Sequence, residues 1–281
     1  MSAPAFSVLT SLTSTRPAAD PLLFRSELLT VRECRVVERC ATRHQLAFAR
    51  AVRHFGDDAA TAVDPTRAVL VLSGDAPPRR AAIGALGTTW TVLGFAREAA
   101  LLSRAPWPRG RVDVTVAPRV LMRLHALRAA LLHGTPLGPR AVEDEALALL
   151  AELLASAAAE RATHVPGSWR RRVLAEGARA IVARDPGAAH PLVDVARALG
   201  VSASHLAHVF RAEVGMPLHR WLLHIRLAVA LERLAAGDAH LSALALDLGF
   251  ATHSHFSAAF RRWLGTSPAA ARAALRDTHI C

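Results

Sequence analysis

The sequence has no lysine and no tyrosine, only three cysteines, and no stretch of 18 apolar residues without a charge. The missing apolar stretch argues against a membrane span. The first residues, MSAPAFSVLT, also lack the charged and apolar regions of a secretory signal. We therefore expect a soluble, cytoplasmic protein that does not bind a membrane.

The cysteines, Cys34, Cys40 and Cys281, are too few and too scattered for a disulfide scaffold or a zinc site. If Cys34 and Cys40 share one extended strand, about 20 Å separates them. That distance is too long for a disulfide unless a turn lies between them. We expect ordinary thiols, and neither a metal nor a cofactor.

Arginine carries the whole basic charge, and the net charge of the 281 residues is +11. A basic balance favours a polyanionic partner, either nucleic acid or an anionic surface. Residues 168–281 hold 14 arginines against eight acidic residues, so about half of the excess lies outside them. The charge therefore supports a polyanionic partner without locating its binding site.

Residues 25–98 have the pattern of β-strands. Large side chains alternate with alanine in 46–52 (LAFARAV), the run 69–72 (VLVL) is apolar, and 88–95 (TTWTVLGF) is β-branched and aromatic. Turn signals such as Asp64-Pro65 and Pro77-Pro78 divide these runs. Several short strands of this kind predict a small barrel or sandwich.

Residues 117–162 change to helical periodicity, with a break at Gly134 and Pro136. In the second of these helices, leucines 147, 150, 153 and 154 form one apolar stripe. The stripe is typical of packing against the strands, and a dimerisation helix is the alternative interpretation. Residues 165–168 (VPGS) have the composition of a linker. We predict three parts: a β-rich domain (1–115), a helical dimerisation or packing segment (116–165) and an all-α domain (166–281).

Two segments of the last part share one design: 192–211 (LVDVARALGVSASHLAHVFR) and 241–261 (LSALALDLGFATHSHFSAAFR). Both have an alanine four residues before a central glycine, a leucine one before it and an apolar residue one after it. A small residue permits two helices to approach closely, and glycine can adopt the positive φ of the turn between them. Ser202 and Thr252 stand where an N-cap should begin the second helix. The duplicated spacing predicts two helix-turn-helix units.

The segment between these units reads as one helix of roughly 19 residues, from Pro217 to the helix stop at Gly237-Asp238. At 1.5 Å per residue it spans about 28 Å. One turn of B-DNA is about 34 Å long. A connector of this length could hold two recognition helices in successive major grooves on one face of DNA.

Residues 169–276 resemble the DNA-binding domain of the AraC/XylS family of bacterial transcription regulators. The similarity rests on the segment 192–210, the connector motif RLAVAL (226–231), LALDLGF (244–250) and FSAAFRRWLGTSP (256–268). The sequence departs from the family pattern at Ala271, where an aromatic residue is usual, and at Trp221 and Trp263, where Tyr or Phe is common. The N-terminal part is similar in layout to the cupin-like domain of many members, although His44 and His54 do not make a cupin metal motif.

The resemblance implies an α+β protein: a cupin-like β-barrel, two helices, and an all-α domain with two helix-turn-helix units. It implies a sequence-specific transcriptional regulator, more often an activator than a repressor, with an N-terminal effector-sensing or dimerisation domain. The partners are then double-stranded promoter DNA, RNA polymerase, a second copy of the chain, and a small-molecule effector if one exists. Arg32, Arg35, Arg50 and Arg53 hint at an anionic effector, or form a solvated strand face.

The residues expected on the reading faces of the two recognition helices are polar, small or basic, because such side chains can contact phosphates and base edges. The predicted DNA-binding residues are Ser202, Ser204, His205, Ala207, His208, Arg211, Thr252, His253, Ser254, Ser257, Ala258 and Arg261. Ala207 and Ala258 can offer only apolar contact to a thymine methyl group. Arg170, Arg171 and Arg172 are expected to contact phosphates or solvent.

Two other functions are alternatives to this one. Some relatives join this domain to an alkyl-transfer repair enzyme built on a four-cysteine zinc site, but only two cysteines precede residue 168. We therefore expect no enzymatic activity. An architectural protein without an effector is the remaining alternative.

Overall fold

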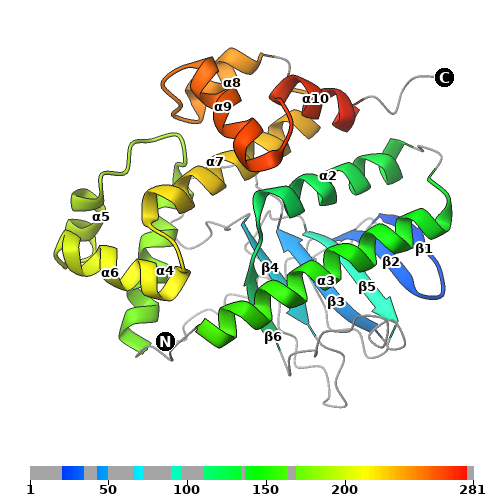
Figure 1. The fold of residues 1–281 in the computed structure, drawn as a ribbon, viewed down its shortest axis with the longest axis horizontal. Coiled ribbons are helices and arrows are strands. Elements are labelled where there is room, and N and C mark those ends of the chain that lie inside the picture. The colour runs from blue at the N-terminus through cyan, green and yellow to red at the C-terminus, as the bar shows by residue number, and fades with distance from the viewer. Residues whose placement is uncertain are drawn as a thin grey trace, which may run out of the picture.

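The structure is a computed structural model of the full chain. It describes residues 21–34, 43–49, 66–71, 90–96, 111–133, 137–163, 169–238 and 240–276. Helices cover one face of a β-sheet, and a larger helical part lies against those helices (Figure 1). No helix within these ranges is both long and apolar enough to cross a membrane.

Six antiparallel strands form one open sheet in the order β1-β2-β5-β3-β4-β6. The strands are β1 (Leu22–Arg25), β2 (Leu29–Cys34), β3 (Arg43–Ala49), β4 (Arg67–Val71), β5 (Trp90–Ala96) and β6 (Arg111–Thr115). The three strand runs expected from the sequence correspond to β3, β4 and β5. A closed cupin-like barrel is not confirmed, because the described strands leave the sheet open.

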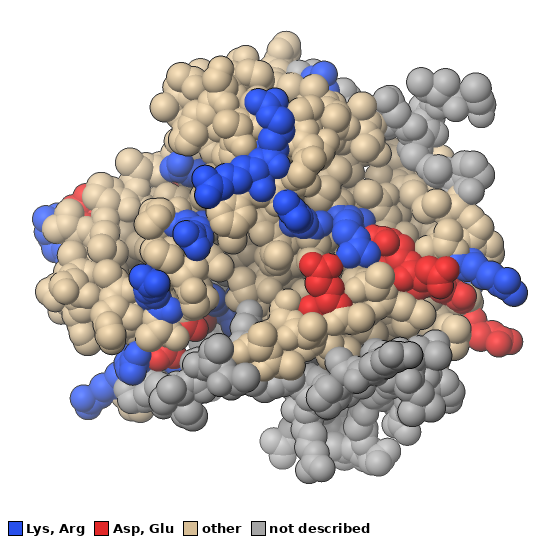
Figure 2. Space-filling view, in the orientation of Figure 1, with Lys and Arg blue, Asp and Glu red and all other residues tan. Residues whose placement is uncertain are grey.

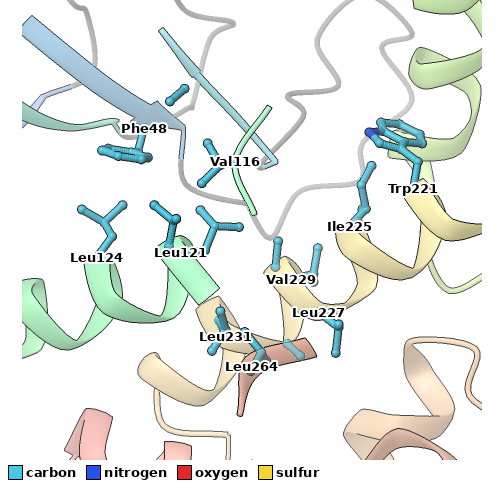
Figure 3. Packing of buried hydrophobic residues seen from close by; sticks show 14 of the residues in the cluster. Phe48, Val116, Leu121, Leu124, Trp221, Ile225, Leu227, Val229, Leu231 and Leu264 are labelled. Carbon is cyan, nitrogen blue, oxygen red and sulfur yellow. The ribbon is translucent and has the colours of Figure 1, made fainter. Parts of the chain in front are cut away.

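The sheet is buried on both faces. On one face Leu46 and Phe48 of β3 point toward the helices, and Figure 3 shows Phe48 beside Leu121 and Leu124. On the other face Ala47 of β3 and Val92 of β5 are also almost completely buried. The strand that the alternation of large residues with alanine predicts is confirmed, but the alternation does not mark a solvent-exposed face here.

Two helices follow the sheet: α2 (Pro118–His133) and α3 (Pro139–Thr163). In the predicted leucine stripe of α3, Leu150, Leu153 and Leu154 are buried within the chain and Leu147 is half-buried. Helix α3 packs on β6 and on α2. The stripe therefore serves packing within the chain, as the first of the two interpretations expected.

Seven helices make up the rest of the described chain. They are α4 (Trp169–Arg184), α5 (Leu192–Ala198), α6 (Ala203–Val214), α7 (Leu218–Ala235), α8 (Leu241–Asp247), α9 (His253–Leu264) and α10 (Pro268–Arg276). Helix α7 joins the α5–α6 pair to the α8–α9 pair (Figure 1). The apolar cores of the sheet part and the helical part are continuous, since their buried residues form one cluster.

Helix α2 is the link between the two parts. One face of α2 covers the sheet, and another packs against α7, α9 and α10. Figure 3 shows Leu231 of α7 and Leu264 of α9 close together below α2. A buried polar contact joins the two parts here, with His125 Nε2 at 3.6 Å from Glu232 Oε1.

Candidate nucleic-acid interface

The first helix-turn-helix unit consists of α5 and α6. Helix α5 packs on α6, and Ala196 of α5 and Leu206 and Phe210 of α6 are all buried. Between the helices Gly200 has φ +68°, and the amide of Val201 donates to the carbonyl of Ala196 (3.0 Å). A side chain with a Cβ is strained at that φ, so the turn favours glycine. The predicted turn geometry is confirmed.

The second unit, α8 and α9, repeats this turn residue by residue. Gly249 has φ +71°, and the amide of Phe250 donates to the carbonyl of Ala245 (2.9 Å). Ala245, Phe256 and Phe260 are fully buried between the helices. The duplicated sequence spacing therefore corresponds to a duplicated backbone geometry.

Both recognition helices, α6 and α9, begin and end with the predicted signals. The Ser202 hydroxyl accepts from the amide of His205 (3.2 Å), and the Thr252 hydroxyl accepts from the amide of His255 (3.1 Å). At the other end, Gly215 (φ +78°) and Gly265 (φ +77°) are left-handed C-caps. Ser202 and Thr252 thus have a structural role whether or not they also contact a ligand.

Most of the predicted reading residues lie on the surface. Ala207 is half-buried and Ser257 is buried. The other ten are exposed and lie within a recognition helix or at its N-cap: Ser202, Ser204, His205, His208, Arg211, Thr252, His253, Ser254, Ala258 and Arg261. The structure brings each set together on one outer helix face. Their contact with DNA remains a prediction.

Two small residues of this set differ in their surroundings. Ala258 is exposed, as expected, and lies on the same outer face of α9 as Arg261. Ser257 is buried, and its hydroxyl lies 3.5 Å from Nε2 of His253. The expectation that Ser257 stands on the exposed face is wrong, because position 257 follows the core residue Phe256 and turns toward the same side of α9. Ser257 can act only through the position of His253.

Arginines near the recognition helices divide into paired and unpaired ones. Arg171 of α4 is held by Glu213 of α6 (3.3 Å), so this member of the 170–172 run is a packing residue. By contrast, Arg211 and Arg261 have no carboxylate partner within the described part of the chain. Arg262 of α9 and Arg220 of α7 are likewise exposed cations, and the sequence reasoning did not single them out as DNA contacts. Figure 2 shows arginines spread over the helical part and acidic residues gathered around α3.

Helix α7 fixes the two units through its own aromatic contacts. Trp221 packs edge-on against Phe210 of α6 (5.7 Å between ring centroids), and His224 packs edge-on against Trp263 of α9 (4.5 Å). Burial, and then the nearby charge of Arg220, lower the pKa of His224 to about 4. The ring is therefore neutral at pH 7 and serves as a packing group rather than as a cation for phosphate.

Comparison with known proteins agrees with this geometry. Residues 195–274 match the family model described as a helix-turn-helix domain. The chain is similar to a putative AraC-like transcription regulator of Streptomyces lividans, with 32% identity over 163 residues, which are 56% of this chain and 52% of that protein. It is also similar to the HTH-type transcriptional activator AarP of Providencia stuartii, with 34% identity over 87 residues, 31% of this chain and 63% of that protein.

The chain thus spans about half the length of the first of these relatives, and somewhat more of the second. Among solved structures, ToxT of Vibrio cholerae aligns over 90% of this chain and 100% of its own, with 10% identity and a TM-score of 0.37. The C-terminal part of the protein is a helix-turn-helix domain of the class that AraC-like transcription regulators carry.

Proposed function

We propose that this protein is a sequence-specific DNA-binding regulator of the AraC/XylS type that activates transcription and has no enzymatic activity. The observation that carries the proposal is the pair of capped recognition helices, each with an exposed polar face and an exposed arginine that has no carboxylate partner in the described chain. Arginine can bind phosphate oxygens or the O6 and N7 edge of guanine.

The test is DNA binding by the full chain at about 150 mM salt, where non-specific electrostatic attraction is partly screened. The duplexes are the DNA upstream of its own gene and random duplex of the same length. We expect the specific duplex to bind at least about 1,000-fold more tightly. Equal affinity for both would end the proposal of a sequence-specific regulator.

Arginine variants then separate two kinds of contact. If Arg211 or Arg261 binds phosphate, its replacement by alanine weakens binding to all sequences and lowers the salt slope by about 1. If it reads guanine, the replacement relaxes specificity at one base pair. Arg140→Ala removes the same charge from the exposed start of α3 and is the matched control.

A small-molecule effector is proposed for the sheet. Support comes from the face away from α2, where the buried Gln45 Oε1 and Trp90 Nε1 have no hydrogen-bond partner in the described chain. Buried polar atoms of this kind are costly unless a ligand or water satisfies them. Thermal-shift screening of the full chain tests this proposal, with Trp90→Phe expected to reduce the shift by any compound that accepts a bond from Nε1.

A homodimer is proposed through the outer face of α3. Alanines 141, 148, 151 and 155 are exposed at helical spacing on that face, which would permit close approach of a second copy. Sedimentation of the full chain should show a dimer, and Ala151→Arg should shift it to monomer. Ala273→Arg, on the exposed side of α10, is the control.

Activation further implies contact with RNA polymerase, in keeping with the activator name of the AarP relative. Transcription from a promoter that carries the selected site, with purified polymerase, should rise when the protein is added. A fall would identify a repressor.

A further inference from the structure

One side chain of the connector helix binds both helix-turn-helix units at once. The guanidinium group of Arg226 donates from Nε to the carbonyl of Pro186 (2.7 Å) and from Nη2 to the carbonyl of Ala188 (3.0 Å). Its Nη1 donates to the carbonyl of Gly249 (2.9 Å). The first two acceptors lie in the segment that leads into α5, and the third lies in the turn between α8 and α9.

The backbone segments that Arg226 joins also touch each other. A Cβ atom added at Gly187 would lie 2.2 Å from the carbonyl oxygen of Asp247, and one added at Gly249 would lie 2.2 Å from the carbonyl oxygen of Gly187. Neither position can hold a larger residue unless the backbones separate. The contact between residues 185–188 and 247–249 is therefore as close as main chain permits.

The first of these segments is braced internally. The Asp185 carboxylate accepts hydrogen bonds from the amides of Gly187 and Ala188, both at 3.2 Å, and the His190 ring bonds to the Asp185 carbonyl (2.7 Å). Pro191 follows directly as the N-cap residue of α5. A restraint on this segment is therefore passed to the start of the first unit.

The chemistry of the contact favours arginine in particular. Its planar group offers five N–H donors in a fixed arrangement, so that three carbonyls at set positions can be bound at once. The guanidinium carbon also lies 5.8 Å from the centre of the Phe250 ring, which follows Gly249 in the turn. A lysine in this place has a single nitrogen and cannot reach all three acceptors with the same geometry.

We propose that Arg226, with Gly187 and Gly249, forms a clamp that fixes the spacing and relative rotation of the two recognition helices. Arg226 is a positioning residue, and the clamp comprises these three residues. Without the clamp, the units are joined through α7, whose 18 residues extend about 27 Å. With the clamp, the contact between residues 185–188 and 247–249 joins the two units a second time. The clamp rests on the proposed function, because it sets the distance between two DNA segments that the protein reads.

The test measures tolerance to spacing in DNA, using the full chain throughout. Duplexes are selected from a random library by the unaltered protein, and the two protected blocks are mapped by footprinting. One base pair is then inserted between the blocks, which shifts and rotates one block relative to the other. For the unaltered protein we expect affinity to fall about tenfold, comparable with the loss from one mismatched base pair.

Two variants open the clamp by different routes. Arg226→Met removes all the donors and keeps a long apolar stem, whereas Gly187→Ala leaves Arg226 intact and forces the two backbones apart. Both should bind the inserted duplex within about threefold of the original one. The spacing penalty is the fall in affinity that the inserted base pair causes. Arg226→Lys should keep part of this penalty. Gly138→Ala, where an added Cβ meets nothing within 4 Å, should keep all of it.

The outcomes separate the clamp from the proposed function. If the unaltered protein selects no sequence from the library, the regulator proposal fails. If it selects a site, and both Arg226→Met and Gly187→Ala keep the full spacing penalty, the clamp is refuted. Loss of spacing discrimination with helical content retained in circular dichroism supports the clamp, because a merely structural role would lower binding to both duplexes equally. Should Arg226→Met fail to fold, Gly187→Ala and Arg226→Lys decide the matter alone.

Discussion

The two helix-turn-helix units have the same turn, the same caps and different supports. Behind α6 lies α4, which is tied to it by the Arg171–Glu213 ion pair. Behind α9 lie α10 and α2, and α2 is the helix that covers the sheet. The second unit is therefore packed directly on the element that would move if the sheet changed, whereas the first is not.

The polar contacts that join the sheet part to the helical part also differ between the two units. The first unit's supporting helix α4 reaches the sheet through Arg67–Glu176 (3.0 Å), an ion pair with an exposed glutamate. Exposed ion pairs contribute about 0–1 kcal/mol. The link near the second unit, His125–Glu232, is buried, and removal of one partner leaves a buried polar group unsatisfied, at a cost of about 1–3 kcal/mol. A signal from the sheet should therefore reach the second unit more strongly.

The largest expected effect comes from breaking the aromatic core of the second unit. Phe256 packs on Phe250 and Phe260, with ring centroids 5.1 and 5.5 Å away. Phe256→Ala should lower the free energy of unfolding by about 3–5 kcal/mol. The equivalent Leu206→Ala should cost about 1 kcal/mol less, because no aromatic pair is lost with it. Urea unfolding of both variants measures the difference.

The control for this prediction is Ser254→Ala, an exposed substitution on the same helix, which should change stability by less than about 0.5 kcal/mol. Equal losses for Phe256→Ala and Leu206→Ala would show that the aromatic contacts add nothing beyond burial.

Acid should loosen the second unit before the first. The pKa of His224 is lowered to about 4 by burial, whereas an unfolded histidine titrates near 6.5. Below pH 6.5 the unfolded chain therefore binds a proton that the buried ring of the folded protein does not bind. The free energy of unfolding consequently falls as pH drops from about 6.5 to about 4. The loss from this group is up to about 3 kcal/mol.

Hydrogen exchange at pH 7 and pH 5 should show the loss in α9, where Trp263 contacts His224, more than in α6, where Trp221 contacts Phe210. His224→Leu removes the titrating group and should flatten the pH dependence of stability. His219→Leu, an exposed residue of the same helix, should leave that dependence unchanged. An unaltered slope in His224→Leu would contradict the assignment.

The helical part could be predicted from the sequence because its signals are local. A glycine at positive φ, a capping hydroxyl and apolar residues at helical spacing each depend on a few neighbouring residues, and all three were identified in both units. Ser257 was misplaced because one helical position decides between core and surface. The spacing of Phe256 and Phe260 alone does not show how wide the buried face of α9 is.

The sheet and the clamp depend on residues far apart in the chain. Strand β6 lies outside the stretch that the sequence predicts as strands, and its place beside β4 follows from pairing between residues 40 to 48 positions apart. The sequence shows Arg226 only as part of a family motif, because nothing local indicates that its acceptors are 38–40 residues before it and 23 after it. The leucine stripe of α3 shows the same limit, because periodicity predicts a buried face without naming what covers it.

The link between α2 and α7 can be measured as a coupling energy. His125→Ala and Glu232→Gln each remove one side of the buried pair, and the double variant should be less destabilised than the sum of the two by about 0.5–3 kcal/mol. Urea unfolding gives the three values. The same cycle on Arg67 and Glu176, the exposed pair, should give less than about 1 kcal/mol. Equal coupling in both cycles would remove the distinction between the two supports.

The smallest expected effect separates the structural role of the N-caps from their predicted role in DNA binding. Ser202→Ala and Thr252→Ala each leave an amide of the first helical turn without its acceptor, and each should cost about 1 kcal/mol of stability. Aspartate caps a helix as well as serine does, so Ser202→Asp and Thr252→Asp should keep the stability measured by urea unfolding. Their negative charge would nevertheless repel phosphate, so DNA affinity should fall in both. If the aspartate variants bind DNA as tightly as the native protein, Ser202 and Thr252 are caps that lie away from the bound DNA.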